Sequence, residues 1–457
     1  MRQKSLFIHL SRKSWSDWTM GIMSGSNSTL VVIYLNIFLY ALCYQMQRPL
    51  EPFLVDRLVG KEGSSANEYA RLQSFFFIVQ TLGSLFIGRL IDSIGYKWGF
   101  MLNFLASGLS YFILSESRTL FLLYLSKLPT VFQAGFLCAQ VAVTRSEFDG
   151  ASRVTLLGRL TTSYTIGSVV GPYIGGMIGT SGDYYFGAKI ACLGSIVSMV
   201  LCLLLPSQDS GKQKPADEKS EANNTEPIDR EDRSKDSSVP KASILQIVKS
   251  AWLLLSVKIV SNVANAIASS VLPIIFKDVF KLSEYQMGVT MSIISAFNAL
   301  ITGLALSPIV ALANGDLLRV ITTSLTSLII IQFIQGGLAL PFISGRSFAG
   351  GFYEYFGLAL LSSMAQFVLA NSLTSEATQC VEENSRGTLI GLEHSIFAAA
   401  RVFAPTLGVA LLSFGGISAA SASCGLIFLG CQATWLIFKV DLVPVNHSAS
   451  RETSKHK

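Results

Sequence analysis

The sequence predicts an all-α polytopic membrane protein with twelve transmembrane helices, arranged as two six-helix repeats. Three observations support this prediction: an apolar composition, a regular series of long apolar segments, and an internal repeat. Half of the 457 residues are apolar, only 14% are charged, and the mean hydropathy is +0.49. A water-soluble domain of this size does not show that balance, so the chain is expected to lie in a lipid bilayer.

Twelve apolar segments are long enough to cross a hydrocarbon layer of about 30 Å at 1.5 Å per helical residue. The first six belong to a predicted N-terminal bundle, residues 30–206, and lie near 30–55, 69–91, 98–116, 119–143, 158–181 and 186–205. The second six belong to a predicted C-terminal bundle, residues 244–438, and lie near 245–276, 284–312, 317–340, 352–377, 387–412 and 417–438.

An internal repeat relates the two bundles. At one offset of 233 residues, eight of the 24 positions that begin at Ser152 are identical without a gap. The identical residues include arginine, proline and glycine, which chance similarity between two apolar helices does not readily supply. Such parallel repeats are typical of transporters. The matched pairs are Ser152 with Ser385, Arg153 with Arg386, Thr155 with Thr388, Leu156 with Leu389, Gly158 with Gly391, Val169 with Val402, Pro172 with Pro405, and Gly175 with Gly408.

Three polar regions lie outside the spans: an N-terminal tail at 1–29, a linker at 207–243 and a C-terminal tail at 439–457. The linker holds 7 basic and 9 acidic residues in 37 positions, cannot bury a core, and is expected to be disordered. If the N-terminal tail is cytosolic, 21 basic residues lie on that side and 6 on the other. The positive-inside bias therefore places both termini in the cytosol. The plasma membrane and an endomembrane both remain open.

A ten-residue segment between the second and third spans carries the most specific motif. Gly88, Asp92, Gly95 and Lys97 stand at the spacing Gly-x-x-x-Asp-x-x-Gly-x-Lys. Gly88 allows a close helix approach, Asp92 can pair with a cation or cap a helix, and Gly95 permits a turn. The segment resembles the loop signature of the major facilitator superfamily, and the resemblance implies a gating loop.

The predicted fifth helix has a glycine at every fourth position, which makes one flat face for close helix packing: Gly167, Gly171, Gly175 and Gly179. Within it, Gly171, Pro172, Gly175 and Gly176 resemble the motif of the antiporter branch of that superfamily. The resemblance implies that this helix packs between the two halves and resists leak.

The chain also resembles an orphan branch of the superfamily, solute carrier family 22 member 18, and the bacterial tetracycline exporters. Ala139-Gln140, Leu157 to Leu160, Ser261-Asn262 and Pro405 with Gly408 carry this resemblance. It implies twelve helices around a central cavity that opens to alternate sides. In the fourth span, Lys127 stands where superfamily exporters commonly have an arginine.

Polar side chains inside the spans are candidates for a solute or proton pathway, because charges in a bilayer are costly and usually functional. Lys258 is expected to bind an anionic group or relay a proton, and a buried ion pair with Glu51 or Glu393 is the alternative. Local pairing of Arg48 with Glu51 is an alternative to solute binding. Glu393 is expected either to titrate or to be exposed to headgroups. The candidates are Gln45, Arg48, Glu51, Lys127, Lys258, Asn262, Glu393 and Arg401.

These features together predict a monomeric secondary transporter that exports a small organic solute or drug-like ion in exchange for protons. A uniporter or symporter is an alternative, as is a membrane scaffold without transport. No catalytic motif, metal-ligand spacing, cofactor fingerprint or basic stripe for nucleic acid is present, so an enzyme is disfavoured. The seven scattered cysteines are expected to be inert thiols.

Overall fold

The computed structural model describes residues 25–60, 63–144, 150–206, 249–301, 306–314, 316–340, 351–381 and 386–438. The predicted linker and C-terminal tail lie outside these residues, as does the predicted N-terminal tail up to residue 24. Within them the chain forms helices and turns, without a strand.

The N-terminal half crosses the bundle six times. Its helices are α2 (Gly25–Gln47), α3 (Glu51–Val59), α4 (Ser65–Ser115), α5 (Leu120–Lys127), the 3-10 helix η2 (Leu128–Phe132), α6 (Gly135–Thr144), α7 (Gly150–Gly179) and α8 (Phe186–Leu203). The 51-residue α4 makes two of these passes. Gly95 separates them with φ 80° and ψ 163°, a left-handed conformation that glycine adopts at little cost.

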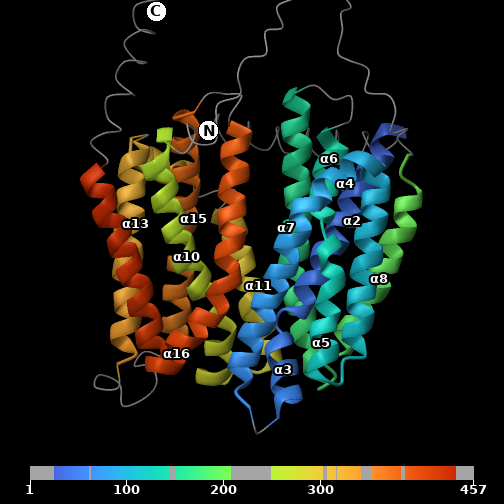
Figure 1. The fold of residues 1–457 in the computed structure, drawn as a ribbon, viewed down its shortest axis with the longest axis horizontal. Coiled ribbons are helices and arrows are strands. Elements are labelled where there is room, and N and C mark those ends of the chain that lie inside the picture. The colour runs from blue at the N-terminus through green and yellow to red at the C-terminus, as the bar shows by residue number, and fades with distance from the viewer. Residues whose placement is uncertain are drawn as a thin grey trace, which may run out of the picture.

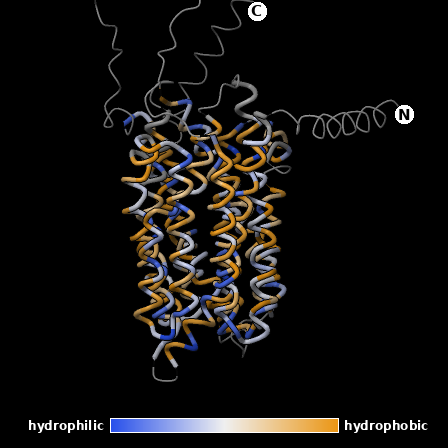
Figure 2. Tube along the Cα trace, turned by 90° about the vertical axis from the view of Figure 1, so that its right-hand side faces the viewer, coloured by the Kyte–Doolittle hydropathy of each residue, from blue (hydrophilic) through white to orange (hydrophobic). Residues whose placement is uncertain are grey.

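The C-terminal half repeats this arrangement. Its helices are α10 (Trp252–Ile274), the π-helical turn η3 (Ile275–Val279), α11 (Glu284–Leu300), α12 (Leu306–Leu312), α13 (Leu317–Leu338), α15 (Gly351–Gln379) and α16 (Arg386–Phe438). A turn at Gly415 and Gly416 divides α16 into two passes. The predicted all-α membrane fold is confirmed, and apolar residues run along the full length of the helices (Figure 2).

Among the described residues, prolines break two passes inside the bundle. The first pass breaks between α2 and α3, where Pro49 lacks a backbone donor and Pro52 lies in the first turn of the new helix. The fourth pass breaks after Pro129, and the Asn103 side chain accepts the exposed backbone N–H of Ala134 at 2.8 Å. Broken helices are tolerated in a bilayer where neighbouring groups satisfy the freed backbone or where they line a cavity.

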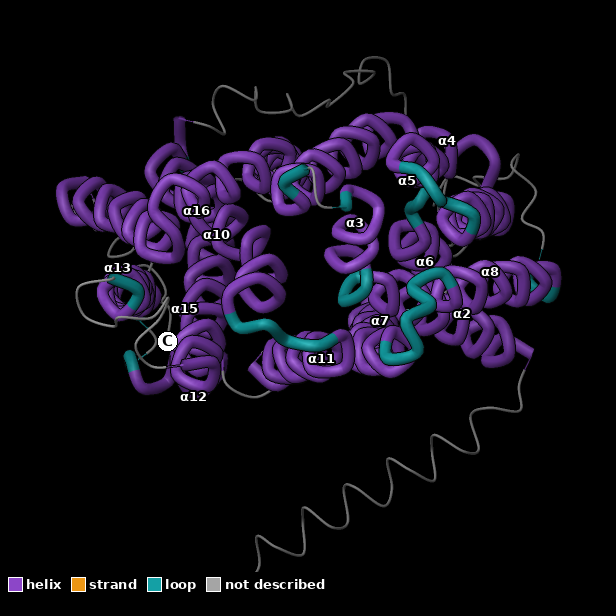
Figure 3. Tube along the Cα trace, turned by 90° about the horizontal axis from the view of Figure 1, so that it is seen from below, coloured by secondary structure: helices purple, strands orange, loops and turns teal. Residues whose placement is uncertain are grey.

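The two halves stand side by side, with α2 to α8 on one side and α10 to α16 on the other (Figures 1 and 3). We call the end where α2 begins and α16 ends the terminal end, and the end where α3 ends the opposite end. Across the halves, α7 packs against α11 and α4 packs against α16.

The halves are joined mainly at the opposite end. One apolar cluster there combines residues of both halves, such as Leu54 and Tyr111 with Phe276 and Tyr355. The apolar clusters nearer the terminal end are each confined to one half. In Figure 1 the halves accordingly diverge toward the terminal end. The structure is therefore closed at the opposite end.

Candidate functional site

A cavity between the halves has two adjoining parts, and Arg48, Tyr69 and Gln73 line both of them. One part leaves about 80 Å³ for the centres of water-sized molecules, which is room for roughly five waters. Its other polar or aromatic lining residues are Phe77, Asn265, Ser269, Ser270, Phe397 and Arg401. The second part lies within the N-terminal half and is lined also by Tyr44, Glu51, Phe76, Lys127, Thr130 and Gln133.

The N-terminal half holds a buried ion pair in this cavity. Lys127 Nζ lies 2.5 Å from Glu51 Oε1, and both side chains are only 13% exposed. The Gln73 side chain donates to the other oxygen, Glu51 Oε2, at 2.6 Å. The local pair of Arg48 with Glu51 is not formed. These two residues flank the break between α2 and α3, so the helical spacing that would bring them together does not hold across them.

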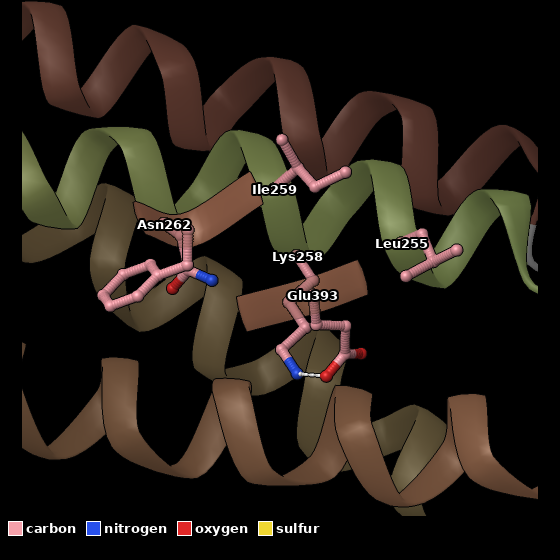
Figure 4. A pocket seen from close by; sticks show the side chains of 6 residues that line it. Leu255, Lys258, Ile259, Asn262 and Glu393 are labelled. Atoms are coloured by element: carbon pink, nitrogen blue, oxygen red, sulfur yellow. Dashed lines mark hydrogen bonds and ion pairs between the residues drawn. The ribbon is translucent and has the colours of Figure 1, made fainter. Parts of the chain in front are cut away.

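The C-terminal half holds a second buried ion pair, between Lys258 and Glu393 (Figure 4). The Lys258 ammonium donates to Glu393 Oε2 and to the Thr374 hydroxyl. The ion pair that the sequence left as an alternative for Lys258 is therefore present. Glu393 is 7% exposed on its side chain and lies inside the protein rather than among headgroups.

A small space adjoins this second pair. Lys258, Glu393, Asn262 and Phe397 line it, and it leaves about 10 Å³ for the centre of a water-sized molecule, which is room for roughly one water. Glu393 Oε1 is buried without a hydrogen-bond partner among the described residues. Asn262 Oδ1 accepts from the Gln366 side chain at 3.5 Å. A single water beside Glu393 Oε1 would give this oxygen a hydrogen-bond donor.

Lys258 lies near one end of its described helix. Helix α10 begins at Trp252, six residues before Lys258. Lys258 therefore lies about 9 Å from that start, in the part of the span nearer the terminal end. Glu393 lies at a similar depth, seven residues after Arg386.

Two arginines line the cavity from opposite halves. Arg48 donates to Gln45 Oε1 at 3.3 Å. The candidate pathway residue Gln45 therefore contacts the cavity-lining Arg48. The Arg401 guanidinium carbon lies 4.1 Å from the centre of the Phe77 ring and 5.7 Å from that of Phe397. The aromatic rings therefore orient the planar guanidinium group of Arg401.

The glycine face of α7 is divided between two partners. A Cβ added at Gly171 would lie 2.8 Å from the carbonyl oxygen of Leu42 on α2, in the same half, and Gly167 and Gly175 also pack on α2. A Cβ at Gly176 would lie 2.8 Å from Gly288 Cα on α11, in the other half. The carbonyl oxygen of Pro172 also approaches Gly288. The antiporter-like segment therefore packs between the halves through Pro172 and Gly176.

The loop motif joins the third pass to the end of α8. Lys97 Nζ donates to the carbonyl oxygens of Leu203 at 3.2 Å and Leu205 at 2.5 Å, which α8 leaves without helical partners. Gly95 makes the turn that the sequence predicted. Gly88 and Asp92 lie within α4, but their surroundings are outside the described part of the chain.

Polar contacts hold the halves together at the opposite end. Lys277 Nζ lies 3.0 Å from Asp56 Oδ1, and the Tyr184 hydroxyl donates to Glu284 Oε1 at 2.6 Å. Burial and the bond to Glu284 raise the pKa of Tyr184 to about 12, so this hydroxyl remains a donor at neutral pH. The Ser74 and Thr406 hydroxyls lie 3.0 Å apart between α4 and α16.

Sequence reasoning missed several members of the site. Gln73 bonds Glu51 and lines both parts of the cavity, and a polar residue inside the second span was a usable signal for it. Thr374 and Tyr69 carry no such signal, because threonine and tyrosine are common in spans that do nothing but pack. The contact between Asp56 and Lys277 joins residues from two halves, and no local sequence pattern predicts it.

Comparison with known proteins gives a consistent result. A family model described as Major Facilitator Superfamily matches residues 33–392. Solute carrier family 22 member 18 of Rattus norvegicus is 25% identical over 85% of this chain and 89% of its own length. The class D tetracycline resistance protein of Salmonella ordonez is 22% identical over 71% of this chain and 82% of its own length.

Solved structures share the fold. The human organic anion transporter MFSD10 (TETRAN) superposes with a TM-score of 0.60 at 16% identity, covering 90% of this chain and 100% of that one. A peptide transporter, POT, in complex with alafosfalin superposes with a TM-score of 0.67 at 13% identity, covering 91% and 94%. At these identities the likeness concerns the fold alone.

Proposed function

The chain belongs to the Major Facilitator Superfamily, and from this premise we propose that it is a secondary transporter that exchanges a small organic solute for protons by alternating access. The sequence resemblance to this superfamily is confirmed. The tetracycline resistance proteins among its relatives support an exporter.

One observation carries the proposal: a polar cavity lies between two halves that are joined at one end and diverge at the other. The joined end contains the shared apolar cluster and the Asp56–Lys277 pair. A solute in the cavity would then reach water from the terminal end only. Rocking the halves to separate the joined end would expose the same cavity to the other side.

The two buried ion pairs are the proposed proton sites. In each, a carboxylate is held by an ammonium group inside the bundle, Glu51 by Lys127 and Glu393 by Lys258. A proton that binds the carboxylate removes its negative charge and releases the lysine, which changes the electrostatic balance between two helices. Each pair also lines a space large enough for water, which provides a route for the proton.

The basic residues predicted on each side support a topology in which both termini and the linker are cytosolic. We propose the five-part division of the chain at residues 29, 206, 243 and 438 on the same basis. The structure would then be open to the cytosol.

Proteoliposomes with an imposed pH gradient test this function. The probes are naphthalene-2-sulfonate and a naphthylmethyl trimethylammonium ion, because permanently charged solutes do not cross lipid as neutral acids or bases. We expect solute movement against its gradient, coupled to proton movement reported by a dye inside the vesicles. One pH unit supports about a tenfold solute gradient for one proton exchanged.

Glu393→Gln is expected to lose this pH-driven accumulation while solute-for-solute exchange continues. Glu116→Gln, at an exposed position at the opposite end, is the matched control and should behave as wild type. If neither probe is transported, the proposed transport of aromatic ions is contradicted. Flux that ignores the pH gradient would instead indicate a uniporter.

A further inference from the structure

We infer that the transported solute is an organic anion with an aromatic body, held between Arg48 of one half and Arg401 of the other. This inference rests on the proposed function and specifies its substrate class. The two residues line the same part of the cavity. No aspartate or glutamate lines that part among the described residues.

Both arginines lie deep in the bundle. Arg48 is eleven residues before the end of α3, or about 17 Å along a helix, and Arg401 is fifteen residues after the start of its pass, or about 22 Å. Neither position lets a guanidinium group reach the headgroups easily. Their charges must therefore be met inside the cavity.

The charges of the cavity do not balance. Each carboxylate near it already has a cation, since Glu51 pairs with Lys127 and Glu393 with Lys258. Arg48 and Arg401 have no ion pair among the described residues, and Arg48 bonds only the neutral amide of Gln45. The two guanidinium groups line the same part of the cavity, and their like charges repel each other.

An uncompensated pair of cations inside a membrane protein is costly, and a bound anion would remove that cost. The cavity is therefore complementary to negative charge. A cation such as a quaternary ammonium would meet two like charges and no free carboxylate in this part of the cavity. Electrostatic repulsion of this kind gives specificity against the wrong substrate.

The residues that line the cavity narrow the class of solute further. Guanidinium groups bind carboxylate, sulfonate and phosphate oxygens in a planar, two-point geometry. Phe77 and Phe397 orient the Arg401 guanidinium group, and Tyr69 adds a third aromatic surface. Gln73 and Asn265 supply neutral hydrogen bonds. This lining fits an aromatic carboxylate or sulfonate, with its charged group between the arginines.

An anion between these residues would also touch both halves at once. Its charge would draw Arg48, in the turn between α2 and α3, and Arg401, on α16, toward each other. A solute that bridges the halves stabilises the conformation in which they approach, and so couples binding to movement.

The test measures binding to purified protein in detergent, which does not depend on flux. The probes are naphthalene-2-sulfonate, its neutral sulfonamide and the naphthylmethyl trimethylammonium ion. We expect the sulfonate to bind at least tenfold more tightly than the sulfonamide, and the ammonium ion to bind most weakly. Arg48→Gln and Arg401→Gln should each weaken sulfonate binding about tenfold or more and leave sulfonamide binding unchanged.

Arg71→Gln is the matched control, because Arg71 is 65% exposed on its side chain and lies away from the cavity. If Arg401→Gln does not fold, Arg401→Lys keeps the charge without the fork and should still weaken sulfonate binding. Equal affinity for sulfonate and sulfonamide overturns the inference, as does a sulfonate preference that survives both substitutions. Flux of the ammonium ion, but not of the sulfonate, through the wild-type protein would overturn it while leaving transport intact. Arginine-dependent sulfonate binding without flux would support it and contradict the transport function.

Discussion

Lys258→Met is expected to destabilise the folded protein by about 3 kcal/mol at pH 8, because it leaves the buried Glu393 carboxylate without its cation. Thermal unfolding of the purified protein at pH 8 measures the effect.

The double variant Lys258→Met with Glu393→Gln separates pairing from packing. It should recover most of the lost stability, because both charges are then absent and only the hydrogen bonds change. Lys189→Met, at an exposed position on α8, should be neutral. If the single and double variants unfold at the same temperature, the two side chains do not interact in the folded protein.

Gly176→Leu is expected to reduce transport about tenfold or more, because a side chain there prevents the opposite end from closing. A Cβ at this position would meet backbone atoms of α11 at 2.8 Å, and backbone cannot move aside without shifting the helix. Such overpacking costs typically about 1–3 kcal/mol, and 1.4 kcal/mol already changes a population tenfold.

The accessibility of this end measures the shift directly. A cysteine placed at Lys277, whose side chain is only 11% exposed, should react faster with a membrane-impermeant maleimide when Gly176→Leu is also present. Gly158→Leu on the same helix has nothing within 4 Å of its Cβ and should change neither flux nor labelling. If Gly176→Leu shows the same labelling and the same flux as the wild type, α7 and α11 need not pack closely for transport.

Features that depend on short stretches of sequence could be predicted. The apolar spans, the turn at Gly95 and the intramembrane charges follow from local composition, because lipid imposes a length and a polarity on each helix. The glycine face of α7 followed from its spacing. Its division between α2 and α11 did not, because the direction in which each glycine points depends on where the neighbouring helices lie.

The partners of the charged residues could not be derived in the same way. Glu51 was placed near Arg48 by helical spacing, yet the break at Pro49 turns it toward Lys127, 76 residues away in sequence. Likewise, Lys258 pairs with Glu393, 135 residues away in sequence. These outcomes depend on contacts between passes, and a single sequence does not encode them in any local pattern.

The central claim is that the cavity reaches each side of the membrane in turn, and reversible cross-linking of the opposite end tests it most directly. Asp56→Cys and Lys277→Cys replace a pair that joins the halves at that end. A short thiol-reactive cross-linker should stop flux in the double variant, and a reducing agent should restore it. Each single variant, treated identically, should keep its flux. Undiminished flux through protein shown to be fully cross-linked would contradict alternating access.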